Sequence, residues 1–183
     1  MQSLHDIPSR HGFTLLELSI TLVVLAILLC LALPSLKGWQ DKQAMRTALN
    51  TLRQDLVAAR SHAIALGDRI VICPGTNGEG CSSSDAWNTG WFVFEDLDQD
   101  REFDMTEPVL KIEGHHERLN ITSAISRSRF VFYPNGTAPG SNGSIWFCGA
   151  RGPQFGHRLV VSNLGRIRSE PYQGLEWEDC PTP

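Results

Sequence analysis

The first feature of the amino-acid sequence is a long run of apolar residues near the N-terminus. Residues 13–33 (FTLLELSITLVVLAILLCLAL) contain one charged side chain, that of Glu17. As a helix this run would match the thickness of the hydrocarbon core of a bilayer, so we expect residues 13–33 to form the transmembrane half of an N-terminal helix. A cleaved secretory signal is the less favoured alternative. Its apolar core would be shorter, and Ala32-Leu33-Pro34 is a poor cleavage site.

Residues 34–67 keep the helical period but become amphipathic. Apolar residues recur in steps of three and four, which places them on one face of a helix. They are Met45, Leu49, Leu52, Leu56, Ala59, Ala63 and Leu66. Gly67 is a natural stop for the helix. We therefore expect this second half of the helix to pack its apolar face on a globular head.

Residues 68–183, the expected head, contain short apolar segments separated by Pro-Gly and Asn-Gly turns. This pattern predicts eight strands. They are residues 69–73, 90–95, 109–112, 119–122, 129–133, 144–148, 158–162 and 166–168. A long helix followed by an antiparallel β-sheet is an α+β architecture, which is the fold class we expect.

The amino-acid composition and the length of the chain exclude several classes of protein. The chain has 183 residues, of which 42% are hydrophobic and 20% are charged. These values exclude a disordered chain and a polytopic membrane protein, and the length allows one domain with an appendage. The sequence contains no GxSxG, HExxH or phosphate-binding loop, so we expect no enzyme activity and no cofactor.

The amino-terminal residues resemble the processing site of type IV pilins and pseudopilins. Gly12 precedes the apolar run, Phe13 is the first residue of the run, Glu17 is the fifth residue after Gly12, and Pro34 follows in register. The resemblance implies that residues 1–12 are a leader, that prepilin peptidase cuts after Gly12 and methylates Phe13, and that Glu17 is needed for assembly with other pilins into a fibre. A carboxylate in hydrocarbon would pair with the amino terminus of a neighbouring subunit. The chain would cross the bacterial inner membrane once, with its head in the periplasm.

Four further segments resemble the GspH/FimT/FimU branch of this family. They are AARSHAI at 58–64, VICP at 71–74, GWFVF at 90–94 and VVSNLGR at 160–166. With the processing site they cover most of the chain in order. The branch implies a pilin-like fold, in which a long N-terminal helix packs on an antiparallel β-sheet head.

Cysteine usage indicates an oxidising compartment. Cys30 lies in the apolar run and is expected to be an inert apolar residue, whereas four cysteines lie beyond residue 70. We favour the pairs Cys73 with Cys81 and Cys148 with Cys180, although four cysteines allow three pairings. A zinc site is the less favoured alternative, because the chain has no CxxC pair and no histidine at ligand spacing.

Charge is distributed unevenly along the head. Residues 79–117 contain eleven acidic and two basic side chains, whereas residues 118–169 contain seven arginines, no lysine and no acidic residue. Arginine binds phosphate through two parallel hydrogen bonds, so the basic part of the head suits a polyanion. The alternative is a solvated face whose arginines pair with the acidic part.

The last expected strand carries the most suggestive arginines. Arg166 and Arg168 are two residues apart, so on a strand they project from the same face. With Gly165 they resemble the GRxR motif of FimT, the minor pilin implicated in DNA binding during natural transformation. We therefore expect double-stranded DNA as a partner. The expected contacts are Arg166, Arg168, Arg158, Arg151 and Arg129. The alternative is a purely structural subunit, either a FimU-like minor pilin or a GspH-like pseudopilin of type II secretion.

The segment from Asp96 to Glu107, which we name the acidic loop, resembles the ligand series of an EF-hand. Arg101 stands at the sixth position, where that loop has a glycine, and the flanking segments are predicted strands rather than helices. We therefore expect a solvated hairpin tip and no metal site, with opportunistic calcium binding as the less favoured alternative.

Overall fold

A computed structural model describes residues 13–75, 80–116, 119–149 and 152–171, and within these ranges it leaves out the side chains of residues 30–38, 125, 149 and 152–155. The chain forms two compact units, residues 1–40 and residues 41–183, which we name the helix unit and the head unit. Helix α1 (Leu15–Leu66) contributes to both.

Helix α1 begins two residues later than the expected start at Phe13, because Thr14 caps it. The Thr14 Oγ1 accepts a hydrogen bond of 3.2 Å from the backbone N–H of Glu17. A threonine followed three residues later by a glutamate is a capping-box sequence, and a first-turn carboxylate is also favoured by the helix dipole. Glu17 therefore has a local structural role at the start of α1.

In the helix unit the described side chains of α1 are exposed throughout residues 13–29. Its large apolar side chains are between 49% and 84% exposed. Among the residues that the structure describes, no helix combines the length and the apolarity that a membrane crossing requires. The transmembrane prediction for residues 13–33 is therefore not confirmed.

In the head unit α1 has one buried face, as the amphipathic pattern predicted. Its buried apolar residues are Met45, Ala48, Leu49, Leu52, Leu56, Ala59 and Ala63. Leu66, the last residue of the predicted stripe, is 49% exposed because the helix ends there. Gly67 follows with φ at +81° and donates its N–H to the Ala63 carbonyl, which ends the helix at the expected glycine.

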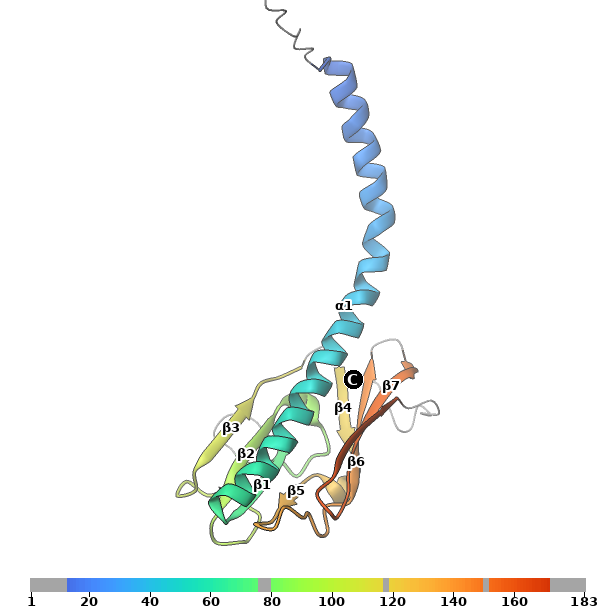
Figure 1. The fold of residues 1–183 in the computed structure, drawn as a ribbon. Helices are drawn as coiled ribbons and strands as arrows, with labels where there is room; N and C mark the ends of the chain where they lie inside the picture. The colour runs from blue at the N-terminus through green and yellow to red at the C-terminus, as the bar shows by residue number, and fades with distance from the viewer. Residues whose placement is uncertain (1–12, 76–79, 117–118, 150–151, 172–183) are drawn as a thin grey trace, which may run out of the picture. The chain divides into compact units, whose positions relative to one another are not determined.

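The described residues of the head form eight strands, the number expected, and these make two antiparallel sheets (Figure 1). The first sheet has the order β3-β2-β1-β5, and the second has the order β4-β6-β7-β8. The strands are β1 (Arg69–Pro74), β2 (Trp91–Asp96), β3 (Val109–Glu113), β4 (Leu119–Ser123), β5 (Phe130–Phe132), β6 (Gly143–Gly149), β7 (Gly152–Val161) and β8 (Ile167–Pro171). Along the chain the strands change sheet three times, because β4 pairs with β6 of the second sheet whereas β5 returns to pair with β1 of the first.

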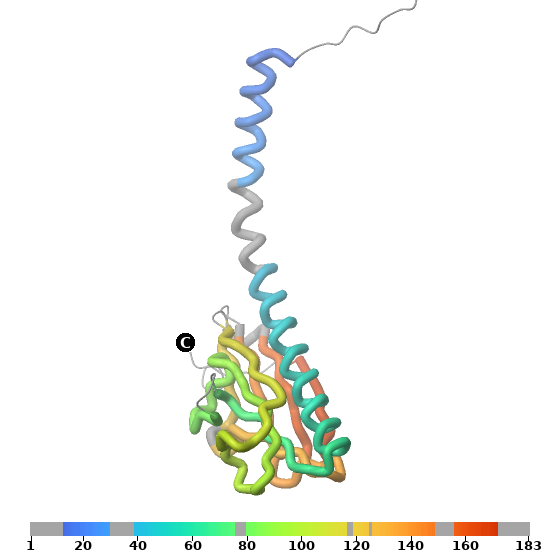
Figure 2. The backbone as a smooth tube through the Cα atoms, turned by 90° about the vertical axis from the view of Figure 1, so that its left-hand side faces the viewer, coloured from blue at the N-terminus to red at the C-terminus, as the bar shows by residue number. Residues whose placement is uncertain are grey.

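One core lies between the second half of α1 and both sheets, which run beside the helix in Figure 2. Strands of both sheets contribute to it, for example through Ile72 of β1 and Phe147 of β6, which are fully buried with Leu52 of α1. A second apolar cluster lies on the other face of the first sheet. It contains Val71, Cys73, Phe92, Phe94 and Val131. Because both faces of the first sheet are buried at β1 and β2, these two strands are nearly continuously apolar, whereas the edge strand β3 is partly exposed and contains Lys111 and Glu113.

Candidate functional site

The hairpin of β7 and β8 holds the two arginines that the sequence singled out. Its turn is closed by hydrogen bonds from Gly165 N to Ser162 O at 2.8 Å and from Ser162 N to Arg166 O at 3.0 Å. Gly165 has φ at +72°, and a Cβ there would lie 2.1 Å from the Gly136 carbonyl oxygen. Only glycine fits such an approach, so the turn is fixed against the neighbouring segment. Arg60 of α1 donates to the same carbonyl at 2.8 Å.

Arg166 and Arg168 both point away from the core. Val161, the residue opposite Ile167, is buried, and Ile167 packs against the core between the two arginines. Arg166 is exposed, and half of the Arg168 side chain is exposed. Alternation along the strand therefore places the two guanidinium groups on the outer surface.

An acidic residue that the sequence analysis did not weigh lies beside them. Glu170 of β8 stands opposite Arg158 of β7, and the Arg158 Nη2 lies 2.9 Å from its Oε2. The Arg168 Nη1 lies 3.8 Å from the other carboxylate oxygen. Glu170 is the first acidic residue after the acid-free segment of residues 118–169. Pairing of the two strands around the turn at Gly165 would have placed it opposite Arg158 and so indicated this ion pair. Among the described residues, the Arg166 side chain has no hydrogen bond or ion pair.

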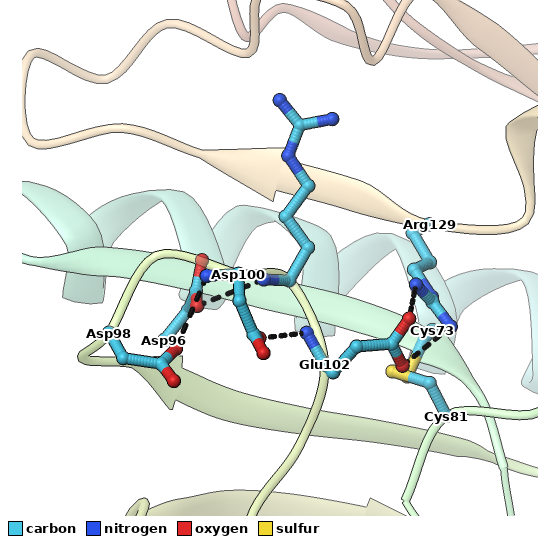
Figure 3. A network of polar contacts seen from close by, with 8 residues as sticks. Cys73, Cys81, Asp96, Asp98, Asp100, Glu102 and Arg129 are labelled. Atoms are coloured by element: carbon cyan, nitrogen blue, oxygen red, sulfur yellow. Dashed lines mark hydrogen bonds and ion pairs between the residues drawn. A yellow bond between two sulfur atoms is a disulfide. The ribbon is translucent and has the colours of Figure 1, made fainter.

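Arg129 does not join this group. It precedes β5 of the first sheet, and its guanidinium donates to both carboxylate oxygens of Glu102, with Nη2 2.9 Å from Oε2 (Figure 3). Arg129 therefore pairs with an acidic residue of segment 79–117, as the alternative interpretation of the charge pattern proposed. Arg129 lines a hollow with Arg101 and Arg127. Arg151, the fifth expected contact, lies outside the described residues.

Three described cysteines of the head are disulfide-bonded. Cys73 of β1 is bonded to Cys81, as favoured from the sequence, so neither residue is a zinc ligand. Cys148 of β6 is also disulfide-bonded. Its expected partner, Cys180, lies outside the described residues. The bond between Cys73 and Cys81 fastens the segment after β1 to the second apolar cluster.

Two of the residues expected to serve in processing and assembly, Phe13 and Glu17, lie at the start of the described chain. Gly12 is outside the described residues, and the side chain of Phe13 is 82% exposed. Glu17 is exposed in the first helical turn. Both Phe13 and Glu17 are therefore accessible in the isolated chain.

Sequence reasoning missed a buried polar contact between α1 and the first sheet. Asp55 is 6% exposed, and its Oδ2 accepts a hydrogen bond of 2.7 Å from Trp91 Nε1. Its Oδ1 accepts one of 2.7 Å from Lys111 Nζ. The signal was present, because Asp55 lies three residues after Leu52, on the apolar face of the helix. This contact orients α1 on β2 and β3.

The acidic loop is the part of the described chain that could hold a metal ion. Asp96, Asp98 and Glu107 each offer a carboxylate oxygen, and the three oxygens lie within 4.8 Å of one another. Asp96 is 1% exposed and Glu107 is 5% exposed, so the two ends of the loop are buried, whereas residues 97–102 and 104–106 between them are exposed, as expected for a solvated hairpin tip. Burial raises the pKa of both carboxyl groups above their ordinary values.

Comparisons with known proteins identify the relatives of this fold. Residues 48–165 match the family described as type II transport protein GspH, and residues 7–33 match the prokaryotic N-terminal methylation motif. Among curated proteins, none matches the chain. The type IV minor pilin FimU of Pseudomonas aeruginosa PAO1 is structurally similar, with a TM-score of 0.54 and 20% identity over 73% of this chain and 92% of that chain. The minor pseudopilin EpsH of the Vibrio cholerae type 2 secretion system gives a TM-score of 0.45 at 11% identity, over 69% of this chain and 95% of that chain.

The structural likeness and the family match support different conclusions. The likeness to FimU shows the expected α+β fold of a long helix on antiparallel sheets. The GspH match ends at Gly165, immediately before the two hairpin arginines, so it carries no information about them. Pilins and pseudopilins are structural proteins rather than enzymes, and they assemble with one another into fibres. Because the family match spans more than half of the chain and the methylation motif precedes it, the chain belongs to the GspH family of minor pilins and pseudopilins.

Proposed function

We propose that the chain is made as a precursor, cut by prepilin peptidase between Gly12 and Phe13, methylated on Phe13 and incorporated into a pilus-type fibre. Before assembly, residues 13–33 would anchor it in the bacterial inner membrane with the head in the periplasm, and the assembled form would be periplasmic or extracellular. The observation that carries this proposal is the match of residues 7–33 to the methylation motif.

The exposed apolar surface of the helix unit supports the proposal. Side chains such as Leu16, at 71% exposed, and Leu22, at 57%, surround the described start of α1. A contiguous apolar surface of this kind is rare on a free soluble protein and indicates contact with lipid or with another protein. A fibre subunit would make both kinds of contact. Its apolar side chains would lie in lipid before assembly and would pack against neighbouring helices afterwards.

Processing can be tested with the full chain expressed together with an active prepilin peptidase. Mass spectrometry should find a mature chain that begins at Phe13 and carries one added methyl group. A Gly12→Val variant adds a β-branched side chain at the cut bond and should remain uncut. A wild-type chain that keeps residues 1–12 beside an active peptidase would contradict the proposal.

The role of Glu17 can be separated from its role in the helix cap. A Glu17→Gln variant loses the charge that would pair with a neighbouring amino terminus, but glutamine is equally suited to the capping box. We expect the variant to be processed normally and to be depleted from sheared fibres. A Thr14→Ser variant, which keeps both the cap and the charge, is the matched control. Normal incorporation of Glu17→Gln would remove the assembly role.

A second function, binding of double-stranded DNA, is favoured by the β7–β8 hairpin. Arg166 is exposed and without an ion pair among the described residues, and Arg168 has only a long contact to Glu170. The turn is already fixed by Gly165, so little ordering of the backbone would oppose binding. Contacts of this kind would reach phosphates and would not depend on base sequence. The alternative is a structural FimU-like or GspH-like subunit, in pilus assembly or in type II secretion, that binds no DNA.

An electrophoretic mobility assay with the full chain in nonionic detergent tests DNA binding. Wild type should bind duplex DNA at about 50 mM salt and lose most of that binding by about 200 mM. Arg166→Ala with Arg168→Ala should abolish the shift, whereas Arg129→Ala should leave it intact because Glu102 already pairs with Arg129. Glu170→Gln should strengthen binding, because it removes the negative charge beside Arg158 and Arg168. Equal binding by wild type and the double variant would exclude this hairpin as the site.

A further inference from the structure

The acidic loop is exposed at residues 97–102 and 104–106, but its two ends and the side chain of Phe103 are packed against the protein. Phe103, in the middle of the loop, lies on the second apolar cluster, with its ring centroid 4.7 Å from that of Phe92 and 5.5 Å from that of Phe94. This anchor draws both ends of the loop against the first sheet. Asp96 and Glu107 are consequently buried, whereas Asp98 between them is exposed.

Backbone N–H groups donate hydrogen bonds to three of the four oxygens of the two buried carboxylates. Glu107 accepts hydrogen bonds from the N–H of Leu97 at 2.9 Å and of Asp104 at 3.1 Å, one on each oxygen. The Asp96 Oδ1 accepts one from the N–H of Arg101 at 3.1 Å. The Asp96 Oδ2 is buried and has no hydrogen-bond partner among the described residues. A buried ionised oxygen without a partner costs free energy, so this atom indicates a missing positive ligand.

The basic side chain of Arg69 does not fill that place. Arg69 lies close enough to influence Asp96, but its Nη1 donates to the Gln99 carbonyl at 3.2 Å. Its guanidinium carbon also lies 4.6 Å from the centre of the Tyr133 ring. Glu102 points the other way, toward Arg129, whereas Asp96 and Asp98 lie together (Figure 3). The three converging acids of the loop therefore keep an uncompensated negative charge.

We propose that Asp96, Asp98 and Glu107 bind a calcium ion. Carboxylate oxygens are the preferred ligands of Ca²⁺, and acids at the first, third and twelfth positions match the spacing of an EF-hand loop. Arg101, at the sixth position, has φ at +69°, which is the left-handed conformation that glycine supplies in that loop. The residue that argued against a calcium loop in the sequence therefore adopts the required backbone conformation. Mg²⁺ fits less well, because it demands regular octahedral geometry at shorter distances.

Thermal unfolding of the full chain in nonionic detergent, freed of metal with a chelator, tests this site. Tryptophan fluorescence reports on the head, because Trp87 and Trp91 are buried there. Extracellular calcium modules bind with Kd values of about 0.1 to 1 mM, so about 10 mM CaCl₂ should raise the Tm by roughly 3 to 8 °C. MgCl₂ at the same concentration should raise it by much less, and calorimetric titration should find one Ca²⁺ per chain.

Three variants make the test specific. Asp96→Asn keeps an acceptor for Arg101 N but removes the buried charge, so it should abolish the calcium-dependent rise in Tm. Asp98→Asn should do the same, and because Asp98 is exposed its loss of binding cannot be a failure to fold. Glu102→Gln removes the same charge from the same loop, but its carboxylate serves Arg129, so the rise should persist. The proposal is overturned if calcium leaves the wild-type Tm unchanged, or if Glu102→Gln loses as much of the rise as Asp96→Asn.

Discussion

The two parts of α1 face different surroundings although both are rich in apolar residues. In the helix unit the described side chains of residues 13–29 are all exposed, whereas in the head unit a stripe that includes Leu52, Leu56 and Ala59 is fully buried. The difference follows from pattern rather than from hydrophobicity. The first part is apolar all round, which suits a helix surrounded by lipid or by other helices, and the second is apolar on one face, which suits one internal partner.

The comparison shows where each part finds its stabilisation. The second part is stabilised within the chain, by both sheets and by the contact of Asp55 with Trp91 and Lys111. The first part has no such internal partner among the described residues. Substitutions in the second part should therefore change the stability of the head, and substitutions in the first part should change only what happens between chains.

The largest effect is expected from a truncation in the buried stripe. Leu56→Ala removes a fully buried side chain from the core between α1 and the two sheets, so the free energy of unfolding should fall by about 2 to 5 kcal/mol. Leu25→Ala, at a position 51% exposed in the helix unit, should change head stability by less than about 0.5 kcal/mol. Urea unfolding of the full chain in detergent, followed by tryptophan fluorescence, measures both. Similar losses in the two variants would contradict the division of α1.

A smaller loss is expected at Asp55, the buried acid of the second part. Asp55→Ala leaves the Trp91 N–H buried without its acceptor and Lys111 without its closest carboxylate, so stability should fall by about 1 to 3 kcal/mol. Asp55→Asn keeps one acceptor and should cost less. Glu17→Gln in the first part is the matched control and should leave the unfolding midpoint of the head unchanged. A head that tolerates Asp55→Ala without loss would show that this contact contributes only orientation.

Local pattern was enough to predict the elements, but not how they pair. The eight strands and the buried stripe follow from periodicity, which is a property of neighbouring residues. The division into two sheets depends on β5 pairing with β1, about sixty residues earlier, and no local signal specifies that pairing. The sequence therefore predicted the antiparallel β-sheet head but not its division into two sheets.

The contacts of the charged side chains also depend on how distant segments pair. The exposure of Arg166 and Arg168 followed from alternation on a strand, whereas the pairing of Arg158 with Glu170 required the register of β7 and β8. Burial of Asp96 and Glu107 accompanies the packing of Phe103 on Phe92 of β2, which no local charge pattern indicates. Sequence reasoning placed acidic and basic residues in the right segments, but it could not tell which charges are compensated.

The smallest effect is a pH dependence confined to the head unit. Burial, with a contribution from Arg46 of the second part of α1, lowers the pKa of His157. Burial also lowers the pKa of His116, against the opposing effect of Glu113 and with a small added effect of His115. Residues 13–40 contain no histidine, so the first part of α1 has no corresponding group.

The sign follows from proton uptake. Above a pH of about 6.5 both histidines are neutral in the folded and the unfolded chain, so they add no pH dependence. Below that pH the unfolded chain binds protons that the folded head resists, so the free energy of unfolding falls as the pH drops from about 6.5 toward the lowered pKa values. Urea unfolding between pH 7.5 and pH 5.5 should show this decline in wild type and a flatter one when His116 and His157 are both replaced by glutamine. Because the double variant shares every carboxylate with wild type, the difference between the two curves isolates the histidines. Parallel curves would mean that neither imidazole resists protonation in the folded head.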